Sequence, residues 1–149
     1  MDTLTKVVQA GHRAVLSNYD KLYLDCGTGN WITGGASWCA PYKSWQDVWG
    51  NEPLADHTLT KDEQALVLGG EVALWGESID ATNIDQKAWP RGCAHAERMW
   101  SPRAELGVTW TNATHRLLVH RERMVARGIS VNQIMPRYCL QNPGGCPAP

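Results

Sequence analysis

The chain has 149 residues, which is enough for one ordinary domain. Its formal net charge of −1 argues against a partner recruited by a long-range field, such as nucleic acid or an acidic membrane. A hydrophobic content of 43% is typical of a globular protein, and no apolar run approaches the roughly 20 residues of a membrane-spanning helix. The segment Met1 to Lys6 lacks the basic start and apolar core of a signal peptide.

Short apolar segments alternate with polar loops in the first part of the chain. The spacing of leucine and valine predicts a helix over 4–10, which Gly11 ends. Residues 13–17 have the length and apolar character of a strand, and residues 22–25 are either a second strand or the end of the same segment. A loop rich in glycine and tryptophan follows over 26–41.

Two helix-start signals precede the next strand. Ser44 stands before apolar residues at helical spacing, which predicts a short helix that reaches Trp49. Thr60-Lys61-Asp62-Glu63 matches a capping box and predicts a single helical turn. That turn leads directly into a predicted strand over 66–75.

Helical patterns dominate the second half. Pro90 fits the first helical position of a segment that runs to Trp100, and a longer helix runs from Trp110 until Gly128 stops it. One face of the longer helix is basic and is expected to be a solvated outer face, since nucleic-acid binding would need aromatic residues between the charges. The tail, 136–149, is rich in proline and glycine. The basic residues are Arg116, Arg121, Arg123 and Arg127.

The segment from Gly69 to Glu77 is the most informative part of the chain. Residues i and i+2 of a strand point to the same face, so Trp75 and Glu77 are predicted to lie side by side. Such a pair suits a sugar ring, whose C–H face stacks on an aromatic ring and whose hydroxyls donate to a carboxylate. For a single tryptophan, burial in the core is the commoner role.

Several motifs occur in a fixed order between Gly11 and Cys146. Together they resemble the end of the catalytic domain of the β-N-acetylhexosaminidases, the family 20 glycoside hydrolases. The resemblance implies an α/β fold, the C-terminal portion (about the last two β/α units) of a (β/α)8 TIM barrel over 1–135, with a disulfide-closed tail over 136–149. Two strands cannot close a barrel, so we expect a C-terminal part of a larger protein. The motifs are Ser17-Asn18-Tyr19-Asp20-Lys21-Leu22-Tyr23-Leu24-Asp25-Cys26-Gly27, Trp38-Cys39-Ala40-Pro41-Tyr42, the segment from Val67 to Asn83, Trp89-Pro90-Arg91 and Glu97-Arg98-Met99-Trp100-Ser101.

The resemblance assigns roles to matching positions. Tyr23 would hydrogen-bond the substrate's N-acetyl group, and Asp25 would bind a sugar hydroxyl. Trp75 would form a wall of the pocket for the terminal sugar, and Glu77 would accept hydrogen bonds from distal hydroxyls. Trp38 would stack on the sugar beyond the scissile bond, as in chitin-processing members.

Two other tryptophans lie near Trp38 in the sequence. They are Trp31 and Trp45, and Trp45 is expected to be structural.

The resemblance also implies a mechanism. Family 20 enzymes use the substrate's own acetamido oxygen as the nucleophile, and an Asp-Glu pair within His-x-Gly-Gly-Asp-Glu moves the protons. The only Asp-Glu step here is Asp62-Glu63, whose capping role explains it. We therefore expect a parent glycosidase that acts on terminal β-linked N-acetylhexosamine with retention of configuration. Tyr23 would support catalysis in that protein, and the isolated chain is expected to be inactive. The alternative is a non-catalytic carbohydrate-binding or structural relative.

The five cysteines indicate disulfides and one thiol. Cys26 and Cys39 bracket the glycine-rich loop, and a disulfide between them would close it. The Cys139–Cys146 spacing resembles the family's terminal disulfide, which leaves Cys93 as a buried thiol. No cysteine or histidine set has zinc spacing, so no metal or other cofactor is expected.

Paired cysteines imply an oxidising compartment, so the parent is expected to be secreted, lysosomal or vacuolar. Asn112-Ala113-Thr114 is a glycosylation sequon within the long predicted helix. The expected partners are glycans with β-linked GlcNAc or GalNAc, or chitin oligomers. The resemblance also leaves room for a homodimer.

Overall fold

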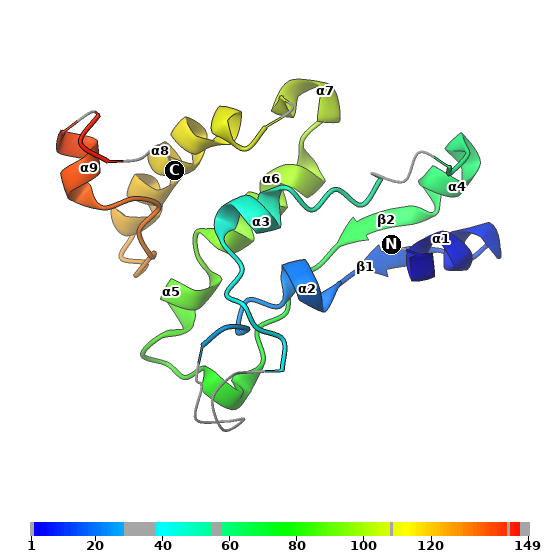
Figure 1. Ribbon diagram of the computed structural model, residues 1–149, viewed down its shortest axis with the longest axis horizontal. Coiled ribbons are helices and arrows are strands. Elements are labelled where there is room, and N and C mark those ends of the chain that lie inside the picture. Colours follow the sequence, from blue (N-terminus) through cyan, green and yellow to red (C-terminus); the bar gives the residue numbers. More distant parts are fainter. Residues whose placement is uncertain (1, 29–37, 55–57, 108, 143, 147–149) are drawn as a thin grey trace.

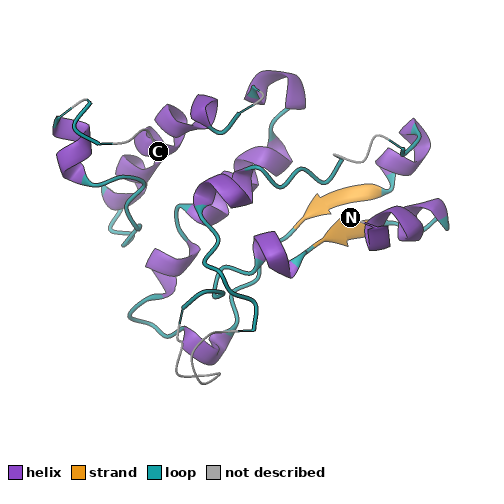
Figure 2. Ribbon diagram, in the orientation of Figure 1, coloured by secondary structure: helices purple, strands orange, loops and turns teal. Residues whose placement is uncertain are grey.

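The computed structural model describes residues 2–28, 38–54, 58–107, 109–142 and 144–146. A pair of strands lies beside one end of a mostly helical chain, and the two termini are far apart (Figure 1; Figure 2). The strands and the helices around them are α1 (Asp2–Gln9), β1 (Ala14–Leu16), α2 (Tyr19–Leu22), α3 (Trp45–Trp49), α4 (Lys61–Ala65) and β2 (Val67–Gly70). The remaining elements are the 3-10 helix η2 (Gly76–Ser78), α5 (Ile84–Ala88), α6 (Arg91–Trp100), α7 (Arg103–Leu106), α8 (Thr111–Val125) and α9 (Arg137–Gln141).

The two strands, β1 and β2, pair in parallel. In the register, Leu16 lies opposite Gly70. Pairing resumes beyond the strands, because Tyr23 and Ala73 form an isolated parallel bridge. The Ala73 carbonyl accepts from the amide of Leu24 at 2.8 Å. The two segments that leave the carboxyl ends of the strands are thus held side by side.

The predicted strand over 66–75 was too long, because β2 ends at Gly70. Gly69 has φ 143°, a conformation that favours glycine and interrupts regular extension. Further on, the chain turns into η2, which contains Glu77, and Trp75 is its N-cap. The prediction that Trp75 and Glu77 share one face of a strand is therefore wrong.

Segment 22–25 also differs from a regular strand. Leu22 ends the short helix α2. Of this segment, Tyr23 alone forms a β-bridge, to Ala73 in the segment that follows β2. Leu22 and Leu24 are both buried, and they pack in a core with Val8, Leu16 and Val48. The side chains of this segment therefore anchor it although its backbone is not a strand.

A second core lies between the helices. Trp45 and Trp49 of α3 pack with Ala94 of α6 and with Ala113 and Leu117 of α8. Both tryptophans are buried, which confirms the structural role predicted for Trp45. The helix α3 therefore joins the core of the sheet to that of the helices, through Val48 on one side and its tryptophans on the other.

The predicted helix starts at Ser44 and Thr60 are confirmed, whereas Pro90 lies just before α6 as its N-cap. Ser44 begins α3 and Thr60 begins α4, each in a complete capping box, with Asp47 and Glu63 as the reciprocal acceptors. Capping depends on residues three positions apart, so it is readable from the sequence. The stop at Gly128 is also confirmed, with φ 85°.

The helix α6 approaches β2 closely at Gly70. A Cβ at that position would lie 2.9 Å from Cε1 of His95, so a side chain there would force the imidazole or its surroundings to shift. Burial lowers the pKa of His95, and the interaction of the imidazole with the Gly70 backbone opposes that shift only in part. The imidazole therefore acts as a neutral core side chain.

The cysteines pair as expected from the sequence. Cys26 bonds Cys39 and Cys139 bonds Cys146, while Cys93 is free and half-buried. Burial raises the pKa of the Cys93 thiol to about 11, so it stays protonated near neutral pH. In the described ranges, no helix has both the length and the apolar character to cross a membrane.

Candidate functional site

Three predicted site residues meet where the paired segments leave the carboxyl ends of the strands. Tyr23 lies in the bridge to Ala73, and Asp25 and Trp75 each lie two residues further along their segments. The Asp25 carboxylate accepts a hydrogen bond from the backbone amide of Trp75 at 3.2 Å. This contact joins positions 50 residues apart and fixes one side of the carboxylate.

The aromatic rings form a connected cluster around Tyr23. Its ring centroid lies 6.0 Å from that of Trp75 and 6.3 Å from that of Trp38. Trp75 is 53% exposed and Trp38 is 70% exposed, so both indoles present ring surface to solvent. Exposed aromatic clusters of this kind mark binding surfaces.

Tyr19 belongs to the same cluster, although the sequence predictions did not include it. Its ring lies 5.3 Å from Trp38 and 6.5 Å from Tyr23. No sequence signal pointed to this contact, because no helix was predicted over 19–22 and Tyr23 is extended where it follows α2. The cluster thus comprises Tyr19, Tyr23, Trp38 and Trp75, with Asp25 at its edge.

Glu77 lies nearby in the chain but is not brought into this cluster. It is exposed in η2, and within the described ranges no hydrogen bond or ion pair joins it to the other predicted residues. Its neighbour Ser78 lies 3.5 Å from the hydroxyl of Thr28, which donates to the Asp25 carbonyl at 2.7 Å. These contacts hold η2 against the turn that follows Asp25.

The disulfide positions Trp38 relative to Asp25. Cys26 follows Asp25 and Cys39 follows Trp38, and their Cα atoms are 5.3 Å apart. One oxygen of Asp25 and the two sulfurs lie within 4.8 Å of one another. The sulfurs are bonded together and are not the thiolates that bind metals, so this grouping does not make a metal site.

A buried arginine supports the site from behind. Arg91 is 2% exposed and donates to the carbonyls of Leu24 at 2.6 Å, Lys43 at 3.0 Å and Lys87 at 2.6 Å. Its guanidinium also lies 4.4 Å from the ring centroid of Tyr42. Burial lowers its pKa, and the electrostatic interactions with Tyr42 and Asp25 partly oppose that shift.

The sequence predictions used Arg91 only as part of a motif. No pattern around Arg91 in the sequence indicated the burial of this part of α6, which includes Arg91, Gly92, Ala94 and His95. Trp31, which the sequence places near Trp38, lies outside the described residues.

Asp62 and Glu63 lie far from the aromatic cluster along the strand pair. They belong to α4, which immediately precedes β2, whereas Trp75 follows its carboxyl end. Figure 1 shows α4 beside α1, at the opposite end of the strands from η2. The Glu63 carboxylate accepts from the Thr60 backbone amide at 2.7 Å, which confirms its capping role.

Two further features lie apart from the cluster. A groove of about 790 Å³ between α6 and α8 is lined by none of the predicted site residues. Asn112 is exposed in the first turn of α8, and its amide oxygen accepts from the Thr109 hydroxyl at 3.0 Å.

The chemistry of the cluster suits a neutral, hydroxylated ligand. Tyrosine hydroxyls donate and accept hydrogen bonds, and an ionised carboxylate accepts from hydroxyls. The indole of Trp75 adds an apolar face beside them.

Comparisons with known proteins agree on one family. The model of the glycosyl hydrolase family 20 catalytic domain matches residues 1–103. The chain is 46% identical over 140 residues to a chitooligosaccharidolytic β-N-acetylglucosaminidase of Bombyx mori, covering 94% of this chain and 22% of that protein. It is 38% identical over 139 residues to a probable β-hexosaminidase of Drosophila melanogaster, covering 91% of this chain and 21% of the other.

Solved structures show the same relationship. A β-N-acetylhexosaminidase of Streptomyces coelicolor superposes with a TM-score of 0.70 at 28% identity, covering 87% of this chain and 25% of that one. An exo-β-N-acetylglucosaminidase of Vibrio harveyi, solved with N-acetylglucosamine, shares the fold with a TM-score of 0.74 at 23% identity, covering 91% of this chain and 21% of that one. The chain thus spans about a fifth to a quarter of the length of the proteins that it matches.

Proposed function

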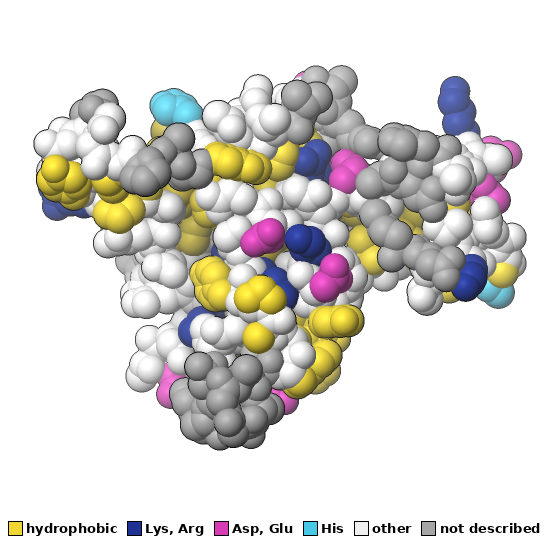
Figure 3. Space-filling model, in the orientation of Figure 1, with side chains coloured by type: hydrophobic (Ala, Val, Ile, Leu, Met, Phe, Trp, Pro, Cys, Tyr) yellow, Lys and Arg dark blue, Asp and Glu magenta, His cyan; other side chains and the backbone are white. Residues whose placement is uncertain are grey.

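Since the chain belongs to glycosyl hydrolase family 20, we propose that it is the C-terminal part of a catalytic (β/α)8 barrel, about its last two β/α units over 1–135 with the tail over 136–149. The parallel pairing of β1 and β2 supports this assignment. So does the exposure of Val15 and Leu68, one from each strand, because parallel sheets are normally covered on both faces. Hydrophobic side chains also reach the surface in several places in Figure 3.

The complete protein would be a glycosidase that removes terminal, non-reducing β-linked GlcNAc or GalNAc from glycans or chitin oligomers. The observation that carries this proposal is the Tyr23–Asp25–Trp75 arrangement at the carboxyl ends of the paired segments. Active sites of barrel enzymes lie at that end of the strands. The terminal sugar would stack on Trp75, and Asp25 would accept from a ring hydroxyl.

The proposed mechanism is substrate-assisted. The acetamido oxygen attacks the anomeric carbon of the same sugar while the glycosidic C–O bond breaks and the leaving oxygen takes a proton from the general acid. Water then opens the cyclic intermediate, so no protein carboxylate forms a covalent bond to the sugar. The Tyr23 phenol would hydrogen-bond that acetamido group and hold it for attack. The general acid would come from an Asp-Glu pair outside these residues, because the only such step, Asp62-Glu63, caps α4.

Two further residues would bind substrate in this proposal. Trp38 would stack on the sugar beyond the scissile bond, which favours chitin oligomers. Glu77 would accept from distal hydroxyls, which requires its exposed carboxylate to turn toward the cluster when a sugar binds.

A second candidate function is sugar binding without catalysis. The upstream sequence discriminates the two candidates, because other residues in place of His-x-Gly-Gly-Asp-Glu there would favour this one. A relative that had lost the acid could still bind sugar through the aromatic cluster.

Release of nitrophenol from 4-nitrophenyl β-N-acetylglucosaminide tests the proposal. We expect the complete protein to release nitrophenol and the purified 149-residue chain to release none. Activity of the isolated chain would contradict the assignment of the acid to another part. A complete protein that binds N-acetylglucosamine but never hydrolyses the glycoside would establish the second candidate.

The two disulfides suggest where the complete protein works. Such bonds persist in oxidising compartments, so the protein would be secreted or would reside in a lysosome or vacuole. The exposed side chain of Asn112 is accessible for glycosylation there.

A further inference from the structure

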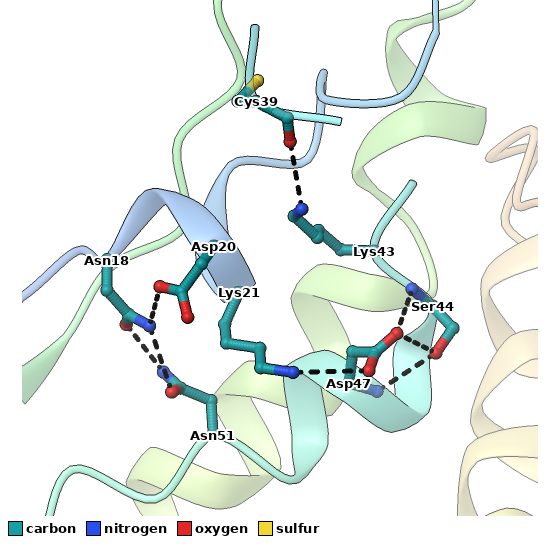
Figure 4. Close-up of polar contacts among 8 residues, drawn as sticks. All are labelled: Asn18, Asp20, Lys21, Cys39, Lys43, Ser44, Asp47 and Asn51. Atoms are coloured by element: carbon teal, nitrogen blue, oxygen red, sulfur yellow. Dashed lines mark hydrogen bonds and ion pairs between the residues drawn. The ribbon is translucent and has the colours of Figure 1, made fainter. Parts of the chain in front are cut away.

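Lys43 is a buried lysine beside the proposed sugar site. It is 5% exposed, and its Nζ donates to the carbonyl of Cys39 at 3.0 Å, as Figure 4 shows. Burial of an ammonium group is unfavourable unless its donors are satisfied. The Cys39 carbonyl is therefore a strongly preferred partner, and this bond fixes the backbone immediately after Trp38.

The backbone of Lys43 is fixed in turn. Its carbonyl accepts from Arg91, and the same guanidinium donates to the carbonyl of Leu24, the residue before Asp25. A continuous series of contacts thus runs from Leu24 through Arg91 and Lys43 to Cys39. It ties the segment that carries Trp38 to the segment that carries Asp25.

Among the described residues, Tyr19 and Tyr23 are the aromatic neighbours of the Trp38 ring, so the position of its backbone matters for where the indole lies. The indole is 70% exposed. A stacking residue that is placed before its ligand arrives spares the ligand the free-energy cost of ordering it. The disulfide constrains Cys39 through its side chain, whereas Lys43 constrains its carbonyl.

We propose that Lys43 is a positioning residue for oligosaccharide binding: through the Cys39 carbonyl it holds Trp38 where the second sugar of a β-linked N-acetylhexosamine oligomer stacks. This inference rests on the proposed function, because it requires Trp38 to face a sugar. It predicts that Lys43 affects the binding of oligomers and has little effect on the pocket for the terminal sugar.

The test uses the complete protein and the variant Lys43→Met, which keeps the length of the side chain and removes the donor. Two constants are measured, the KM for a β-linked N-acetylglucosamine trisaccharide and the Ki of free N-acetylglucosamine as a product inhibitor. We expect KM to rise about tenfold with kcat little changed, since uniform binding is lost. We expect Ki to change less than about twofold.

Matched variants separate positioning from a general structural effect. Lys21→Met removes a half-buried lysine of the same region, which pairs with Asp47 at 3.5 Å (Figure 4), and should leave KM unchanged. Lys43→Arg keeps a donor and should restore the KM. In a double-mutant cycle, Lys43→Met should add no further rise to the KM of Trp38→Ala, because both changes remove the same stacking contact.

The inference is overturned if folded Lys43→Met keeps the wild-type KM, if Ki rises as much as KM, or if its effect adds in full to that of Trp38→Ala. If Lys43→Met fails to fold by circular dichroism, Lys43→Gln replaces it, because its amide is one bond too short to reach Cys39 and the same rise is expected. If the wild-type protein shows no hydrolysis, the proposed function fails separately. In that case the role of Lys43 is tested by calorimetry on the same variants, where the Kd for the trisaccharide should rise and the Kd for N-acetylglucosamine should not.

Discussion

Replacing Tyr23 by phenylalanine is expected to lower kcat for hydrolysis of an N-acetylglucosaminide by the complete protein about 10²-fold. The proposed role of the hydroxyl is to hold the acetamido group as it develops charge during attack. Loss of one such preorganised hydrogen bond has an effect of this size in other enzymes. Phenylalanine keeps the ring between Trp38 and Trp75, so the aromatic cluster is retained.

The fold should not change in this variant. Phenylalanine preserves the backbone bridge of Tyr23, the hydrogen bond that its carbonyl accepts from the Cys26 amide, and its ring neighbours. Steady-state kinetics and a thermal melt are measured together, with Tyr138→Phe in the exposed tail as the matched loss of a phenol. A Tyr23→Phe protein with kcat within about threefold of wild type would contradict the catalytic role of this hydroxyl.

Replacing Arg91 by methionine is expected to lower the free energy of unfolding of the complete protein by about 3–5 kcal/mol. Methionine fills much of the same volume but donates no hydrogen bond. The carbonyls of Leu24, Lys43 and Lys87 would then lose their guanidinium donor. Each buried carbonyl without a partner costs roughly 1–3 kcal/mol, and domains are stable by only about 5–15 kcal/mol in total.

Urea unfolding followed by tryptophan fluorescence measures this loss. Arg127→Met is the matched control, because Arg127 is exposed and donates to one helix carbonyl, that of Arg123. Arg127→Met should change the free energy of unfolding by less than about 0.5 kcal/mol. The loss of stability in Arg91→Lys should lie between those of Arg91→Met and Arg127→Met, since one ammonium cannot reproduce the fork of a guanidinium. A loss below about 1 kcal/mol for Arg91→Met would show that solvent or other donors satisfy these carbonyls.

Local features of the fold were predictable from the sequence. The capping boxes at Ser44 and Thr60 and the helix stop at Gly128 depend on a few neighbouring residues, and all three are confirmed. The end of β2 was not predictable in this way. The apolar run continues past Gly70, and only the partner segment decides which of its residues pair.

The candidate site was predictable in part, because Tyr23, Asp25, Trp38 and Trp75 belong to recognisable motifs. The contact between Asp25 and the Trp75 amide was not, since it joins segments 50 residues apart that meet only in the folded chain. Lys43 and Arg91 were missed for a related reason. Charged residues are usually exposed, and only the structure shows that carbonyls from distant segments surround these two.

A crystal structure of the complete protein with bound N-acetylglucosamine tests most directly whether this chain forms part of the sugar pocket. We predict that the sugar ring stacks on Trp75, that its acetamido group lies within hydrogen-bond distance of the Tyr23 hydroxyl, and that a ring hydroxyl donates to Asp25. A sugar bound in the active site without contact to any of these three side chains would contradict the proposed pocket.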